Sequence, residues 1–108
     1  IVIFQPHLYS RTKEFYKAFA NALNGADYII LTDIYPAREQ PIPGVSSKLI
    51  FDQIETKDTN NLFYLKDLDK LQNIIDSLIE PNSIVLTLGA GNIWRYGEKY
   101  FKHLKKYF

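Results

Sequence analysis

The chain has 108 residues, 46% of them hydrophobic, and a formal net charge of +1, which suits one domain with a single core and argues against nucleic-acid binding. It contains no cysteine, so disulfides and cysteine–zinc sites are excluded, and its two histidines, His7 and His103, have no metal-ligand spacing. No apolar run approaches the ~18 residues of a membrane span and no signal peptide is apparent, so we expect a cytoplasmic protein that does not contact membranes.

Strands and helices alternate along the first half of the chain. Residues 1–4 form a continuous apolar run, which predicts a buried strand, and residues 28–31 predict a second one. Between them, residues 11–24 have helical periodicity, and Gly25 can end that helix. The apolar stripe predicted for this helix consists of Phe15, Phe19, Ala22 and Leu23. A proline-rich loop then leads to a helix over about residues 46–55.

The same alternation continues in the second half. Residues 62–65 predict a short third strand, and Asp67 can cap a helix over residues 68–79. Residues 83–88 predict the fourth strand, and a glycine-rich turn leads into a last helix over residues 96–107. The apolar face predicted for this last helix consists of Tyr100, Phe101, Leu104 and Phe108. The repetition predicts an α/β fold, namely a three-layer Rossmann-like domain with a mainly parallel sheet of four or more strands and helices on both faces.

Three loops should lie at one edge of this sheet, because parallel strands all end at the same edge and ligands bind there in open α/β sheets. These loops hold most of the unusual polar residues and a glycine-rich turn. The candidate site residues are His7, Ser10, Arg11, Tyr35, Arg38, Glu39, Gly89, Ala90, Gly91 and Asn92. A helix N-terminus beside Arg11 would favour an anion such as a carboxylate or a phosphate.

Each loop also has a purely structural interpretation. Ser10 can cap the following helix, and His7 can be a loop histidine bonded to a backbone carbonyl. Arg38 and Glu39 can form part of an ordinary surface, with Tyr35 packed beside them. The third loop can be a tight turn into the last helix, or a place where the backbone approaches a ligand closely.

Familiar nucleotide-binding and catalytic motifs are missing from these residues. The chain has no GxxxxGK[ST], no nucleophile elbow and no paired metal carboxylates, and Trp94 stands where a dinucleotide fingerprint requires glycine. We therefore assign no catalytic residue and no metal ligand. One hypothesis at this point is a stand-alone module that binds anions or nucleotides.

Three segments, in order along the chain, resemble the UDP-N-acetylmuramate–L-alanine ligases of the Mur ligase family. Residues 4–12, FQPHLYSRT, resemble that family's FQPHRYSRT stretch, with Leu8 in place of the commoner arginine. Residues 33–44 are similar to its D-[IV]-Y-x-A-x-E-x-P-I-x-G segment, in which position 38 is often glycine. Residues 88–93 are similar to its GAG[DN]I turn. The resemblance covers most of the chain and concerns the family's C-terminal domain.

This resemblance implies a part in peptidoglycan precursor synthesis, where an ATP-dependent ligase joins L-alanine to UDP-N-acetylmuramic acid through an acyl phosphate. It implies that His7, Arg11, Tyr35 and Glu39 bind substrate, with Arg11 holding the alanine carboxylate, and that the other loop residues line the site. ATP and Mg²⁺ would be held mainly by a central domain outside this chain, so we expect no cofactor and no catalysis in the chain alone. A sister ligase that adds another amino acid is the alternative within the family.

The chain begins inside an apolar run and without methionine. We expect residues 1–108 to be a C-terminal domain that lacks its own first strand and helix and the upstream UDP-sugar and ATP-binding domains. Loss of those elements would bare a sheet edge or an apolar face, and we expect self-association through the truncated edge.

Overall fold

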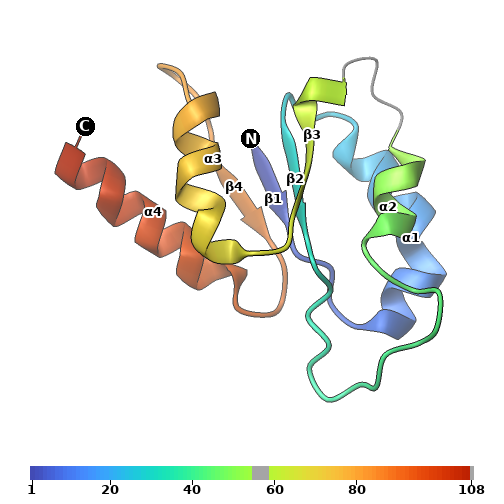
Figure 1. Ribbon diagram of the computed structural model, residues 1–108. Coiled ribbons are helices and arrows are strands. Elements are labelled where there is room, and N and C mark those ends of the chain that lie inside the picture. Colours follow the sequence, from blue (N-terminus) through green and yellow to red (C-terminus); the bar gives the residue numbers. More distant parts are fainter. Residues whose placement is uncertain (55–58, 108) are drawn as a thin grey trace.

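A computed structural model describes residues 1–54 and 59–107 as a parallel sheet between two layers of helices (Figure 1). Its four strands lie in the order β3-β2-β1-β4 and all pair in parallel. Their bounds are β1 Val2–Phe4, β2 Ile29–Thr32, β3 Leu62–Leu65 and β4 Leu86–Leu88. The predicted α/β class, the parallel sheet and the helices on both faces are confirmed.

Helices cover both faces of the two central strands, and all of β2 and the middle residue of β1 are buried. Ile3 of β1 pairs with Ile30 of β2 on one side and with Thr87 of β4 on the other. Ile3, Ile30 and Leu31 have no exposed surface. Continuous β-branched and apolar runs in these strands therefore report burial on both faces, as expected for a parallel sheet.

One face of the sheet is covered by α1 (Tyr9–Leu23) and α2 (Lys48–Gln53). The buried side of α1 consists of Thr12, Ala20 and Leu23. The predicted stripe is partly wrong, because Phe15 is 44% exposed and Ala22 is exposed. The small Ala20 side chain, which the predicted stripe left out, packs into the buried cluster with Leu31 and Ile50, and Phe19 packs against the same cluster.

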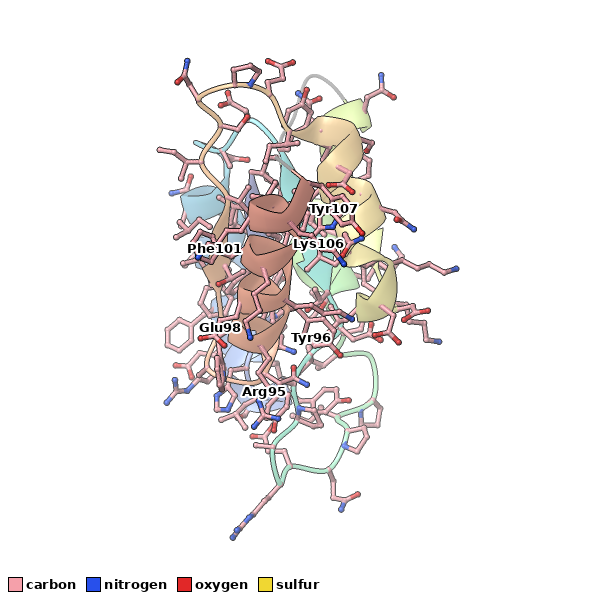
Figure 2. All side chains as sticks on the ribbon, turned by 90° about the vertical axis from the view of Figure 1, so that its left-hand side faces the viewer. Arg95, Tyr96, Glu98, Phe101, Lys106 and Tyr107 are labelled. Atoms are coloured by element: carbon pink, nitrogen blue, oxygen red, sulfur yellow. The ribbon has the colours of Figure 1, made fainter. Side chains whose placement is uncertain are left out.

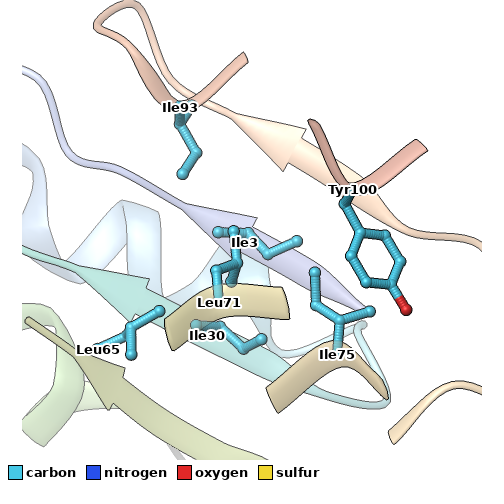
Figure 3. Close-up of a cluster of buried hydrophobic side chains, with 7 residues drawn as sticks. All are labelled: Ile3, Ile30, Leu65, Leu71, Ile75, Ile93 and Tyr100. Atoms are coloured by element: carbon cyan, nitrogen blue, oxygen red, sulfur yellow. The ribbon is translucent and has the colours of Figure 1, made fainter. Parts of the chain in front are cut away.

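The other face is covered by α3 (Leu71–Leu78) and α4 (Ile93–Tyr107). The short 3₁₀ turn η1 (Thr59–Asn61) comes directly before β3, and η2 (Leu68–Lys70) comes directly before α3. Figure 3 shows the core on this side: Ile3, Ile30, Leu65, Leu71, Ile75, Ile93 and Tyr100. Tyr100 brings a hydroxyl into this core and donates it to Asp76 Oδ1 over 2.6 Å. Burial and that carboxylate raise the pKa of Tyr100. The Nε2 atom of His103 lies 3.0 Å from the other oxygen of Asp76.

Element bounds differ from the prediction mainly at helix starts. The first long helix begins at Tyr9 and the last at Ile93, in each case earlier than predicted, and the fourth strand is only three residues long. Asp67 caps η2 as predicted, since its side chain accepts a hydrogen bond from the Asp69 backbone N–H. The expected helix end near Glu55 and the expected apolar position 108 lie outside the described residues.

The predicted face of α4 holds for Tyr100 and Leu104, which pack in the core. Phe101 is 60% exposed, and Figure 2 shows it on the outer side of the helix with Arg95 and Glu98. In the described part of the chain, no helix combines the length and the apolar composition that crossing a membrane would require.

Candidate functional site

The loops that follow β1 and β2 run side by side beyond the ends of their strands. His7 and Tyr35 form an isolated parallel bridge. The Tyr35 N–H donates to the Pro6 carbonyl over 2.8 Å, and the Leu8 N–H donates to the Tyr35 carbonyl over 3.0 Å. The pairing of the two strands thus continues into the loops, at the lower end of the sheet in Figure 1. Two of the three predicted loops are held together by their backbones.

The side chain of Glu39 joins the second loop to the start of α1. Its Oε1 accepts a hydrogen bond from the Ser10 backbone N–H over 3.1 Å, and its Oε2 accepts one from the Ser10 hydroxyl. These bonds lower the pKa of Glu39, and the nearby His7 acts in the same direction. A carboxylate of the chain itself therefore lies at the helix N-terminus where sequence reasoning had placed an external anion.

Two expectations about these residues are corrected by this contact. Ser10 does not cap α1, because it lies in the first helical turn; Leu8 holds the N-cap position with a positive φ of 71° and no side-chain cap. Glu39 is not simply part of an ordinary surface, because its carboxylate accepts hydrogen bonds from Ser10 at the start of α1. The helix is capped by a residue 29 positions away, and no local spacing rule can find such a cap.

The rings of His7 and Tyr35 lie nearly parallel, with 6.1 Å between their centroids and 15° between their planes. The Nδ1 atom of His7 is buried and has no hydrogen-bond partner within residues 1–54 and 59–107. An unpaired buried polar atom costs free energy, and such atoms often mark places where function dictates the residue. We call the edge of the sheet formed by residues 7–12, 35–39 and 89–93 the rim. The stacked pair places an imidazole beside a phenol ring on this rim.

The third loop joins the site through Gln5, which sequence reasoning did not select. Gln5 is only 4% exposed. Its Nε2 donates to Asn92 Oδ1 over 2.7 Å, and its Oε1 accepts the Ile93 N–H over 3.1 Å. The Gly89–Asn92 turn therefore lies against the first loop, and Gly91 lies against the Tyr35 ring. The signal that could have found Gln5 is an amide at the end of an apolar strand, a position where a buried polar group needs partners.

The two arginines of the rim are exposed and make no ion pair with any residue in the described ranges. Arg11 lies in the first turns of α1, and Arg38 follows Ala37, whose φ is 53°. No group of three histidine, aspartate or glutamate side chains in the described residues could hold a metal ion. The rim offers a guanidinium, a carboxylate, an imidazole and a phenol, which together suit a small molecule that carries both charges.

Comparison with known proteins identifies a family that this chain matches. The model of the domain described as Mur ligase, glutamate ligase domain, matches residues 1–91. A UDP-N-acetylmuramate--L-alanine ligase from Geobacter sp. (strain M21) is 44% identical over 97% of this chain. Proteins of the same name from Dictyoglomus turgidum and Rubrobacter xylanophilus are 49% and 43% identical over 91% and 96% of it. The chain spans only 21–24% of the length of these relatives.

Proposed function

This chain belongs to the Mur ligase family, and we propose on that basis that it is part of the C-terminal domain of a ligase that joins L-alanine to UDP-N-acetylmuramic acid. The remaining strand and helix of the domain, and the domains that hold the UDP-sugar and ATP, would lie outside residues 1–108. The observation that carries the proposal is the meeting of three separated loops at one sheet edge, which brings together His7, Tyr35 and Glu39. Arg11 lies in the first turns of α1, directly after the first of these loops.

Arg11 is the residue we assign to the carboxylate of the amino acid. Glu39 already accepts the hydrogen bond of the Ser10 N–H group at the start of α1. The carboxylate of the amino acid therefore needs a different partner, and a cation suits it. Arg11 is exposed and unpaired among the described residues, and its planar group suits a carboxylate. The His7–Tyr35 pair would form one wall of the pocket. Glu39 would act mainly by fixing the second loop to α1.

ATP and Mg²⁺ do not fit the residues of this chain. The sequence has no phosphate-binding GxxxxGK[ST] loop, and the described residues offer no acidic cluster for a metal. In the full-length enzyme ATP would activate the acceptor carboxylate, and the part played by this chain would be to close the amino-acid pocket. We expect the isolated chain to be catalytically inactive.

The proposal is tested by Arg11→Ala in the full-length enzyme. Loss of a charge-assisted hydrogen bond is typically worth about 1.5–3 kcal/mol, so the KM for L-alanine should rise roughly tenfold to a hundredfold. The KM for ATP should change little. Steady-state kinetics with each substrate varied in turn measures both values.

Arg38→Ala is the matched control, because Arg38 is a second exposed and unpaired arginine on the same rim. It should raise the KM for L-alanine less than Arg11→Ala does, because position 38 is often glycine in the family segment that residues 33–44 resemble. Equal effects of Arg11→Ala on both substrates would contradict the assignment. Assays with several amino acids would also distinguish L-alanine from the substrate of a sister ligase.

A further inference from the structure

The ring of Tyr35 lies directly on the backbone of Gly91. A Cβ atom built at Gly91 would be 2.4 Å from Tyr35 Cγ and 2.7 Å from Tyr35 Cδ2, and real Cβ contacts are essentially never shorter than 3.0 Å. The φ of Gly91 is not in the left-handed region, so its own backbone would accept alanine. The space that a side chain would need at this position is the space that the tyrosine ring occupies.

The turn that carries Gly91 is also held in place by Gln5. The Gln5 amide holds the Asn92 side chain and the first N–H of α4 over 2.7 and 3.1 Å. The Gln5 backbone N–H also donates to the Leu88 carbonyl over 2.9 Å. A Cβ at Gly91 would lie 2.8 Å from Gln5 Oε1 as well. The turn therefore cannot retreat from the ring without breaking buried hydrogen bonds.

The backbone of Tyr35 is fixed too, because its N–H and its carbonyl both bond to the first loop. The movable part is the ring, which can turn about its side-chain bonds. That ring stacks on the imidazole of His7. The clash between a side chain at position 91 and Tyr35 would thus be relieved by rotation of the Tyr35 ring. That rotation would change the stacking of the ring on His7.

We infer that Gly91 is a positioning residue that sets the Tyr35 ring against His7 through its lack of a side chain, with Gln5 holding the turn in place. The inference about ring placement stands on the contacts alone. Its consequence for the enzyme rests on the proposed function, in which the same two rings form a wall of the amino-acid pocket. The third loop then contributes to that pocket by shaping it.

Gly91→Ala in this chain tests the ring placement, with Gly25→Ala as the control. Gly25 has no atom within 4 Å of an added Cβ and no left-handed φ, so alanine there meets no neighbour. The His7 and Tyr35 ring protons should shift in the NMR spectrum of Gly91→Ala, because the aromatic ring current at His7 changes. They should be unchanged in Gly25→Ala. Identical ring shifts in Gly91→Ala and the unmodified chain would overturn the inference.

A double-mutant comparison keeps the test decisive if Gly91→Ala folds poorly. The drop in unfolding temperature caused by Gly91→Ala should be at least halved in a Tyr35→Ala background, because the ring that meets the new methyl group is gone. An equal drop in both backgrounds would contradict the inference. In the full-length enzyme, Gly91→Ala should raise the KM for L-alanine more than the KM for ATP. Shifted ring signals with an unchanged KM would refute the pocket wall proposed for Tyr35 and leave the positioning by Gly91 intact.

Discussion

Glu39 shows how a single side chain decides the local structure of the rim. Helix α1 has no acidic residue in its first turn and no side-chain cap from its own segment. The first N–H groups of a helix need partners, and a negative charge near them is favourable. Glu39, which lies on the second loop, supplies the hydrogen-bond partner and the negative charge through its two bonds to Ser10. The bend between Tyr35 and Glu39 is therefore tied to the helix that carries Arg11.

Glu39→Gln should make the stability of the chain depend less on pH. The folded chain lowers the pKa of Glu39, so the ionised carboxylate stabilises the fold above the ordinary pKa of a glutamate. That contribution is lost as the pH falls through the lowered pKa. The unmodified chain should unfold at a higher temperature than the variant at about pH 7, and the gap should close towards about pH 3.

Thermal unfolding at a series of pH values measures this gap. Glu14→Gln, a change at an exposed carboxylate of the same helix, controls for the loss of one negative charge. A gap between the unmodified chain and Glu39→Gln that is the same at neutral and acid pH would show that the carboxylate does not act through Ser10.

At the scale of single residues, sequence could predict which loops meet but not the partners within them. His7, Tyr35 and Gly91 were selected from strand-exit positions, and they do lie together. The capping role of Glu39 and the amide of Gln5 were not predicted, because each joins residues far apart in the chain. Partners of this kind depend on tertiary packing, which the spacing along one segment does not encode.

At the scale of elements, strand β4 is one of the two edge strands of the sheet. It pairs only with β1, and its residues Leu86 and Leu88 are 47% and 38% exposed. A groove of about 470 Å³ runs beside it, with Trp94 and Phe101 of α4 among its lining residues. A strand that has one unpaired edge and exposed apolar side chains can pair with a strand of another chain.

The isolated chain should therefore associate with itself at high concentration, and Leu86→Lys should weaken that association by placing a charge on the edge. Static light scattering over a concentration series measures the mass. Tyr64→Lys is the matched control, because Tyr64 lies on β3, the opposite edge, and is exposed to a similar degree. A stable monomer mass at high concentration, or an equal effect of the two lysines, would contradict association through β4.

The elements themselves were predictable because apolar runs and helical periodicity report burial directly. Their starts were less so. Both long helices begin earlier than predicted, and each donates a backbone N–H at its start to a distant side chain, which is Glu39 for α1 and Gln5 for α4. The predicted stripe of α1 was partly wrong, because it included the exposed Phe15 and Ala22 and left out Ala20. It was chosen by hydrophobicity, whereas the small Ala20 is fully buried in the cluster with Leu31.

At the scale of the whole molecule, the two ends of the sheet offer different surfaces. The carboxyl end carries the rim of charged and aromatic residues. The opposite end has a hollow of about 550 Å³, lined in part by Asp27, Tyr28, Glu80 and Pro81. If cavity volume were the only criterion, that hollow would be assigned as the ligand-binding site. The general rule for open α/β sheets favours the carboxyl end, and the placement of His7, Tyr35 and Arg11 agrees with it.

Amide hydrogen exchange of the full-length enzyme, with and without L-alanine, UDP-N-acetylmuramic acid and ATP, tests whether the substrates bind at the carboxyl end of the sheet. Closure over the substrates should slow exchange in residues 7–12, 35–39 and 89–93, which form the rim, and leave residues 78–84 at the other end unchanged. Slower exchange confined to residues 78–84, with the rim unaffected, would contradict the account.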